Sequence, residues 1–296
     1  MPELPEVETV CRGIAPFIEG ERLCDVHLHR ANLRIPFPEL MAERIGGLSV
    51  ERVYRIAKYV IVALSDGQIL VIHLGMSGQI KMAHDFSSYE ILKHDHMVLS
   101  FGDTDRGDQV KALIYNDPRR FGMVMLFDDE AALKASPSFA KMGPDPFDPD
   151  FNIANFTQRL SSKSGVIKSA LLDQHLIAGL GNIYVCEALF MSGVHPERSA
   201  RSLKKKEIAA LYESIGIVLR KAIAAGGSTL KDFRQADGKL GYFQNELLVY
   251  GREEAPCYEC GKAAIQRIVQ AGRSTFFCPH CQKAETSKKT NMSAKK

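Results

Sequence analysis

The chain has 296 residues, which predicts about two domains of ordinary size, and its 45% hydrophobic and 25% charged residues are typical of soluble globular proteins. No apolar run approaches the roughly 20 residues of a membrane span and no targeting peptide is apparent, so we expect a cytoplasmic protein with reduced thiols and no membrane contact. The net charge of +3 is unevenly divided: Lys and Arg number 22 against 12 Asp and Glu in residues 151–296, and 16 against 23 in residues 1–150, so the basic half favours a polyanionic partner.

A helix is expected directly after the N-terminus. In residues 5–18, apolar side chains recur at intervals of three or four, at Val7, Val10, Cys11 and Ile14. From about residue 21 to 127, short β-branched and aromatic runs alternate with Gly, Pro and Asp; residues 48–80 predict three strands with a hairpin turn at Asp66-Gly67. Further strands are indicated by "HMVLSFGD", "KALIYND" and "FGMVMLFDD". Because no crossover helix separates these runs, they favour an antiparallel β-sandwich.

Three prolines within residues 142–151 predict a domain boundary. We therefore expect a sandwich domain over residues 1–135 and a linker over 136–152. Helical periods dominate the region that we assign to a helical domain, residues 153–244, whereas residues 241–261 predict a return to extended structure. A cysteine-rich module is expected over 245–283, and the polar segment 284–296 is expected to be disordered. The predicted fold class is α+β.

Four of the seven cysteines have the spacing of a metal site. Cys257-x2-Cys260 is followed, after 17 residues, by Cys278-x2-Cys281. This spacing predicts one structural zinc ion bound by four thiolates, and two disulfides are disfavoured in a reducing compartment. Between the two pairs, "QAGRS" predicts a hairpin turn that presents Arg273 to a DNA groove or a phosphate, although a solvated arginine is the simpler reading.

A glycine-rich turn, "AGLGNIY" at residues 178–184, joins two helical segments. Gly179 and Gly181 permit close backbone approach, and Asn182 can cap the next helix and leave backbone amides exposed to a phosphate.

Four motifs in order resemble formamidopyrimidine-DNA glycosylases: "PELPEVETV" from residue 2, "DPRRFG" at 117–122, "LLDQHLIAGLGNIYVCEALF" at 171–190 and the four-cysteine module. The resemblance implies a β-sandwich domain with a leading helix, a helix–two-turns–helix domain with a zinc-finger hairpin, and damaged double-stranded DNA bound between them. It also implies excision of 8-oxoguanine and formamidopyrimidines followed by strand cleavage at the abasic site, by a monomer that is associated with the nucleoid through DNA.

The N-terminal residues account for this chemistry. Removal of Met1 leaves Pro2 with a secondary amine, and an α-amino group has a pKa near 8, so a useful fraction is unprotonated at neutral pH. Attack of that amine on the sugar C1′ expels the base and forms an iminium, which then drives elimination of the phosphates. Glu3 fits a general acid and base for these steps. Alternatively, Glu3 and Glu6 are simply favourable charges at a helix N-terminus.

The resemblance implies further site residues. Lys58 is placed in the catalytic site, where it binds a phosphate near the lesion. Residues implied to contact DNA phosphate or the damaged base are His73, Arg120, Lys168, Asn182 and Arg273. Three side chains fill the space left by the extruded nucleotide: Met76, Arg119, which faces the orphaned cytosine, and Phe121. Without the resemblance, Met76 and Phe121 are read as core residues and Lys58 as a solvent-facing strand residue. Residues 226–244 match the family's loop over the extruded base.

Two alternatives stay open. An endonuclease VIII-like glycosylase would share Pro2, Glu3 and the zinc finger but prefer oxidised pyrimidines; "PELPEVE" and the intact "PRRF" favour the purine enzyme. A non-catalytic zinc-finger DNA-binding protein is the other alternative, and such a protein has no need for a processed proline followed by glutamate.

Overall fold

The computed structural model describes residues 2–102, 110–228 and 234–284. The chain forms two compact units that interleave in sequence. Unit 1 comprises Met1–Phe151, Gln174–Gly181 and Gly216–Glu246, and unit 2 comprises Asn152–Asp173, Asn182–Ile215 and Leu247–Lys296. The contiguous domain boundaries expected from the sequence stay a prediction, and the expected tail lies outside the described residues except for its first residue.

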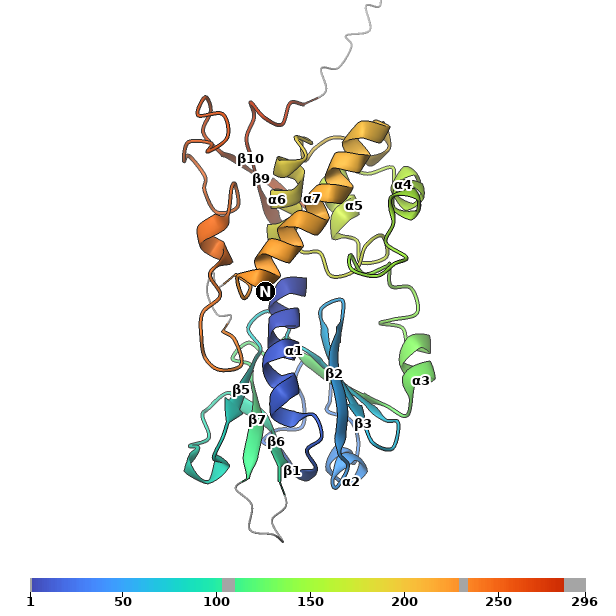
Figure 1. The fold of residues 1–296 in the computed structure, drawn as a ribbon, viewed down its shortest axis with the longest axis vertical. Helices are drawn as coiled ribbons and strands as arrows, with labels where there is room; N and C mark the ends of the chain where they lie inside the picture. Colours follow the sequence, from blue (N-terminus) through green and yellow to red (C-terminus); the bar gives the residue numbers. More distant parts are fainter. Residues whose placement is uncertain (1, 103–109, 229–233, 285–296) are drawn as a thin grey trace, which may run out of the picture. The chain divides into compact units, whose positions relative to one another are not determined.

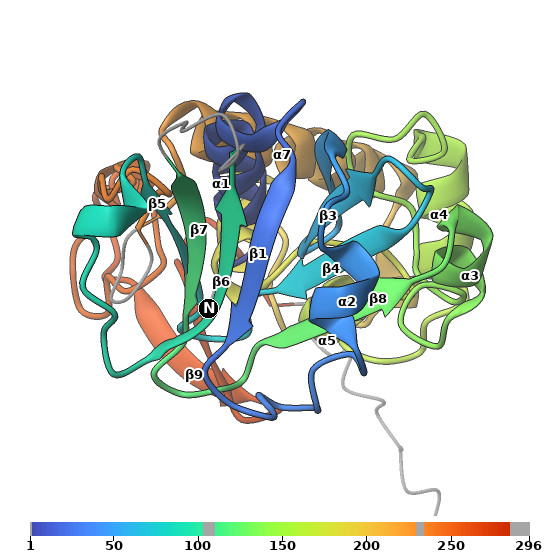
Figure 2. The same ribbon diagram turned by 90° about the horizontal axis from the view of Figure 1, so that it is seen from below.

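Unit 1 is built on two four-stranded antiparallel sheets (Figures 1 and 2). In the first, the strand order is β1 (Leu23–Leu28), β6 (Asp95–Phe101), β7 (Lys111–Asn116) and β5 (Gln79–Ala83). In the second it is β2 (Val50–Ile56), β3 (Tyr59–Leu64), β4 (Ile69–His73) and β8 (Met123–Phe127). The antiparallel sandwich is confirmed, and the three strands expected in residues 48–80 are β2, β3 and β4. A further strand, β5, begins at Gln79 after the turn at Gly75–Gly78 and joins the other sheet.

Helix α1 (Leu4–Ile18) completes the core of this unit. Its apolar face, which includes Val7, Val10 and Ile14, is buried in one hydrophobic cluster with residues of both sheets, such as Val60 and Leu99. The expected helix is thus confirmed. Short helices α2 (Met41–Ile45) and α3 (Glu130–Ala135) and the 3-10 turn η1 (Phe86–Ser88) lie in the connections.

Unit 2 contains α4 (Ile153–Ser161), α5 (Ile167–Leu172), α6 (Asn182–Met191), the 3-10 turn η3 (Ala200–Ser202) and the first part of α7 (Lys205–Ala224). Helix α6 is buried on all sides from Ile183 to Phe190, as expected for a central helix. The hairpin of β9 (Gln266–Gln270) and β10 (Arg273–Phe277) packs against it.

The expectation of extended structure from residue 241 is wrong. Phe243–Glu246 forms the 3-10 turn η4, and no described residue between it and β9 belongs to a strand. The buried Glu187 carboxylate accepts hydrogen bonds from the backbone N–H groups of Leu248, Val249 and Tyr250 at 2.8–3.0 Å. A side chain on α6 therefore satisfies the backbone donors that a neighbouring strand would otherwise pair. Among the described residues, no helix has the length and apolarity to cross a membrane.

Candidate active site

The N-terminal segment of unit 1 is buried and held by Glu6. Pro2 is buried, and Glu3 is only 3% exposed. The Glu3 N–H donates to Glu6 Oε2 (2.8 Å), while Glu6 Oε1 accepts from the Ser228 N–H (2.8 Å). One carboxylate thereby fixes both the start of α1 and the first part of the segment 226–244. Glu6 is more than a favourable charge at a helix end.

The segment Gly179–Gly181 packs directly on this N-terminus. The Leu4 N–H donates to the Gly179 carbonyl (3.2 Å). A Cβ atom at Gly181 would lie 2.1–2.5 Å from the carboxylate atoms of Glu3, so glycine alone allows this approach. Glu3 is thus placed against a backbone turn and not in open solvent.

Lys58 reaches the same segment. Its Nζ donates to the Leu180 carbonyl (2.7 Å), which also accepts from Gln174 Nε2 (3.0 Å). Lys58 lies in the two-residue turn between β2 and β3, next to Ala57 with its φ of 52°. The reading of Lys58 as a solvent-facing strand residue is therefore wrong: the side chain is buried and points to the Gly179–Gly181 segment.

His73, at the end of β4, is a neutral hydrogen-bond donor. Its pKa is lowered to about 4, first by burial and then by the positive charges of Lys58 and Arg34, against the opposite effect of Asp117. Its Nδ1 accepts from the Gly75 N–H (3.2 Å), so the ring proton resides on Nε2. The ring therefore offers one uncharged N–H to an acceptor such as a phosphate oxygen.

Two exposed tips follow. We call Gly75–Gly78 the Met76 tip and Pro118–Gly122 the Arg119 tip. Met76 is 37% and Phe121 43% exposed, so neither is a core residue. Arg119 and Arg120 are exposed, and the guanidinium of Arg119 lies 4.9 Å from the centroid of the Phe121 ring. The apolar and cationic side chains expected to fill a gap in DNA thus stand on the surface of unit 1.

In unit 2, Lys168 and Asn182 hold the β9–β10 hairpin. Lys168 is 1% exposed, and its Nζ donates to the Ser274 carbonyl (3.0 Å) and to the Thr275 hydroxyl. Asn182 Nδ2 donates to the same carbonyl (2.8 Å). Both side chains fix the residue next to Arg273, which is exposed directly after the turn. Burial, followed by the charge of Arg273, lowers the pKa of Lys168.

The hairpin turn predicted at "QAGRS" is confirmed. Ala271 and Gly272 both have positive φ angles, 47° and 73°, and connect Gln270 to Arg273. Such a two-residue turn matches the twist of the paired strands.

The four cysteines Cys257, Cys260, Cys278 and Cys281 fit one tetrahedral zinc ion. Their Sγ atoms all lie within 4.8 Å of one another, with Cys257 and Cys281 3.9 Å apart and Cys260 and Cys278 3.8 Å apart. Thiolates at about 2.3 Å from zinc in a tetrahedron are separated by about 3.8 Å, whereas a disulfide requires about 2.05 Å. A site with four protein ligands has no open position, so the zinc it holds is structural.

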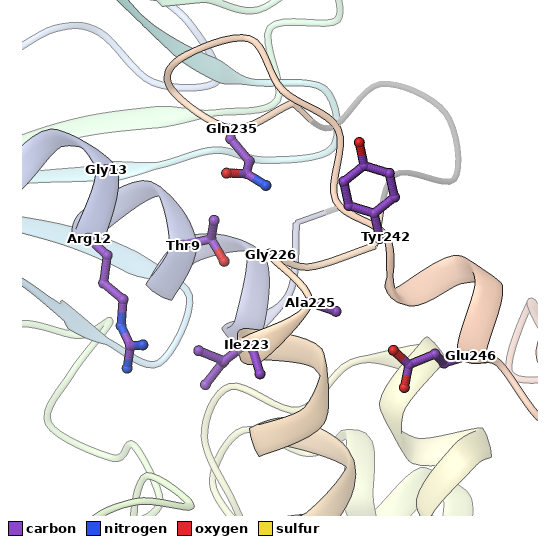
Figure 3. Close-up of a pocket in the computed structure, with 10 residues that line it drawn as sticks. Thr9, Arg12, Gly13, Ile223, Ala225, Gly226, Gln235, Tyr242 and Glu246 are labelled. Carbon is purple, nitrogen blue, oxygen red and sulfur yellow. The ribbon is translucent and has the colours of Figure 1, made fainter.

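A cavity of about 570 Å³ lies in unit 1 beside α1 (Figure 3). Thr9 and Arg12 of α1 face it from one side, and Gln235 and Tyr242 from the other. Gly226, Gln235 and Tyr242 belong to the segment 226–244 that the resemblance assigns to the loop over the extruded base, whereas Pro2, Glu3 and Lys58 do not line the cavity.

The sequence analysis missed two residues of the site. Gln174 holds the turn from both sides, since its Oε1 also accepts from the Gly179 N–H (2.9 Å). Asp117 lies buried beneath the two tips. Gln174 contacts residues five and six positions further along the chain, whereas Asp117 bonds to Ser77, which precedes it by 40 residues. The only sequence signal for either residue was a polar side chain inside a quoted motif.

Three family models match the chain. They are described as the formamidopyrimidine-DNA glycosylase N-terminal domain (residues 1–124), the formamidopyrimidine-DNA glycosylase H2TH domain (residues 142–234) and the zinc finger found in FPG and IleRS (residues 256–284). The last range contains the four cysteines.

Named relatives and solved structures agree. The formamidopyrimidine-DNA glycosylase of Ruegeria pomeroyi is 47% identical over 292 residues, and one from Cereibacter sphaeroides is 48% identical; each match covers 96% of this chain and 100% of the relative. Lactococcus lactis Fpg in complex with DNA containing an abasic site has a TM-score of 0.85 at 37% identity, with 96% of this chain and 100% of that one covered. MutM bound to DNA with a carbocyclic 8-oxo-G reaches 0.84 at 37% identity, with the same coverage. The chain therefore belongs to the formamidopyrimidine-DNA glycosylase family.

Proposed function

We propose that this protein is a bifunctional DNA repair enzyme that excises oxidised purines from duplex DNA and then cleaves the strand at the abasic site. The observation that carries the proposal is the convergence on one backbone segment: the Glu3 carboxylate packs against Gly181, and the Lys58 ammonium binds the Leu180 carbonyl. An acid–base group and a cation are thus fixed beside the residue that becomes the N-terminal amine.

The proposed chemistry begins at Pro2. After Met1 is removed, the nitrogen lone pair of Pro2 attacks C1′ of the damaged nucleotide, the bond from C1′ to the base breaks, and the base leaves with the bonding electrons and a proton. Glu3 donates a proton to the sugar ring oxygen as the ring opens. The result is an iminium between Pro2 and C1′.

The iminium acidifies the C2′ hydrogen. Loss of that proton expels the 3′ phosphate, and a second elimination expels the 5′ phosphate. A secondary amine forms an iminium that has no neutral imine form, so the charge that drives both eliminations persists.

Each unit supplies proposed DNA contacts. In unit 1, the neutral His73 N–H and the Lys58 and Arg120 side chains bind phosphates, and Met76, Arg119 and Phe121 fill the space of the extruded nucleotide. In unit 2, Arg273 binds phosphate, and Lys168 and Asn182 hold the hairpin that carries it. Asn182 Oδ1 is buried without a hydrogen-bond partner among the described residues, so it can accept one more donor. The zinc ion keeps the hairpin folded.

Oxidised purines are the proposed substrates because of the complexes of similar proteins. Lactococcus lactis Fpg variants have been solved with Fapy-dG DNA, and MutM with an 8-oxo-G analogue. Another Lactococcus lactis complex contains an oxidised pyrimidine, so the preference of endonuclease VIII-like enzymes is the second candidate. We further propose a monomer that acts on chromosomal DNA in the cytoplasm.

The product pattern tests this function. We expect the purified protein to release 8-oxoguanine from an 8-oxoguanine:cytosine duplex and to leave phosphates on both sides of the gap, and to act more slowly on a thymine glycol duplex. Glu3→Gln should lower single-turnover excision by at least about a hundredfold, the contribution of a general acid–base group. Pro2→Gly should also lower it strongly, because it replaces the secondary amine that acts as nucleophile. Faster action on thymine glycol would favour the pyrimidine enzyme, and binding without excision would favour the non-catalytic DNA-binding protein.

A further inference from the structure

Asp117 lies directly after β7, at the base of the Arg119 tip, and is 0% exposed. Its two carboxylate oxygens have different partners. Oδ1 accepts from the Ser77 hydroxyl (2.6 Å), whereas Oδ2 accepts from the Gly122 N–H (2.9 Å). Ser77 follows Met76 in the Met76 tip, and Gly122 ends the Arg119 tip. Each carboxylate oxygen therefore accepts a hydrogen bond from one of the two tips.

A second hydrogen bond closes the connection. The Ser77 hydroxyl, which donates to Asp117, also accepts from the Arg119 N–H (3.2 Å). The chain of contacts thus runs from the residue after Met76, through Asp117, to the backbone of Arg119 and Gly122. Ser77, which follows Met76, and Gly122, which follows Phe121, are therefore both hydrogen-bonded to Asp117.

The two tips also touch backbone to backbone. A Cβ atom at Gly75 would lie 2.4–2.6 Å from the Phe121 carbonyl group and the Gly122 nitrogen. A Cβ at Gly122 would lie 1.7 Å from the Tyr115 hydroxyl, which donates to Asp117 Oδ2 (3.4 Å). The two tips are therefore in close backbone contact as well as joined by hydrogen bonds.

We propose that Asp117 is a positioning residue that couples the Met76 tip to the Arg119 tip, so that Met76, Arg119 and Phe121 enter DNA as one preformed wedge. This inference rests on the proposed function of these tips. Preorganised groups lose less freedom on binding, and Arg119 reads the base opposite the lesion only if its backbone is fixed. Loss of the coupling between the two tips should therefore lower the discrimination between opposite bases more than it slows the chemistry at Pro2.

The variant Asp117→Asn tests the coupling because an amide has the same shape but only one acceptor oxygen. With its oxygen on the Gly122 N–H, the amide presents an NH2 group to Ser77, so the charge-assisted hydrogen bond that Asp117 accepts from the Ser77 hydroxyl is lost. Among the described residues Asp95 offers a matched control: it is also a buried carboxylate, at the start of the inner strand β6 of the same sheet. It accepts from the Leu92 N–H, the Tyr89 hydroxyl, Asn116 and Lys81, and it contacts neither tip. Asp95→Asn carries a comparable structural cost.

The readout is the ratio of single-turnover excision rates for 8-oxoguanine opposite cytosine and opposite adenine. Loss of a hydrogen bond to a charged group predicts that Asp117→Asn lowers this ratio by about tenfold, and Asp95→Asn leaves it within about twofold. Ser77→Ala, which removes the hydroxyl alone, should lower the ratio in the same direction if Asp117→Asn fails to fold. Asp117→Asn should have a smaller effect in a Met76→Ala background.

An unchanged ratio in both Asp117→Asn and Ser77→Ala would overturn the inference, as would an equal loss in Asp95→Asn or full additivity with Met76→Ala. A wild-type protein that does not excise 8-oxoguanine at all would instead overturn the proposed function on which the inference rests.

Discussion

At the scale of single residues, burial decides what a side chain can do. His73 loses its charge because it is buried beside Lys58 and Arg34, and its Nδ1 is already occupied by the Gly75 N–H. Lys168 likewise binds the hairpin and not solvent. In both cases the sequence indicates a polar residue, but only the surroundings determine its protonation or its partner.

His73 makes stability depend on pH in a defined direction. Its pKa is about 4 in the folded protein and near 6.5 in an unfolded chain, so on acidification the unfolded state binds the proton first. The stability that the neutral ring contributes is complete above about pH 6.5 and is lost as the pH falls toward 4. We expect His73→Gln to flatten the pH dependence of the unfolding free energy in this range.

Urea unfolding between about pH 7 and 4.5 measures this effect, and nitrogen NMR of the ring measures the pKa and the tautomer. His29, His96 and His195 also have lowered pKa values, chiefly through burial, and contribute to the same pH dependence. The difference between wild type and His73→Gln isolates the contribution of His73. A His73 ring that titrates near 6.5, or that carries its proton on Nδ1, would contradict the structure.

At the scale of elements, the hairpin of unit 2 separates Arg273, which we propose to bind phosphate, from the groups that position it. Arg273 is exposed after the turn, while Lys168 and Asn182 bind the Ser274 carbonyl from α5 and α6. The two cationic side chains therefore differ in role: Arg273 faces solvent, whereas the Lys168 ammonium is bonded to the hairpin backbone.

Salt dependence distinguishes these roles. Removing one phosphate contact lowers the slope of log K against log salt by about 1, because one fewer counterion is released. Arg273→Ala should show this loss, whereas Lys168→Met should weaken DNA binding with the slope nearly unchanged. Fluorescence anisotropy on one duplex between about 50 and 200 mM salt measures both variants. A reduced slope for Lys168→Met would mean that its ammonium binds phosphate.

At the scale of the whole molecule, the sequence predicts the architecture better than the detailed site. The antiparallel sandwich, α1, the hairpin turn and the four-cysteine site follow from periodicity, turn residues and spacing, which are local properties. The extra strand β5 could not be foreseen from the same local pattern, because its partner β7 is distant in sequence. Residues 241–261 were expected to be extended, but Glu187, and not a neighbouring strand, accepts from the backbone N–H groups of residues 248–250.

The interleaving of the two units has the same cause. Residues 174–181 belong to unit 1 because Gly179 and Leu180 bond to Leu4 and Lys58. No composition change marks such a contact. The resemblance gave the residue types of the site in advance, whereas the burial of Lys58 and the two-sided role of Asp117 required the structure.

The central claim is that a secondary amine at Pro2 becomes bonded to the sugar. The most direct measurement is borohydride reduction of the protein mixed with an 8-oxoguanine duplex, followed by mass spectrometry of the peptides. We predict one adduct on the N-terminal peptide, with the oligonucleotide attached to the Pro2 nitrogen. The adduct should be strongly reduced in Pro2→Gly, which has a primary amine, and absent when an N-terminal tag is retained. An adduct on an internal lysine such as Lys58, or no adduct with a wild-type protein that excises the base, would contradict it.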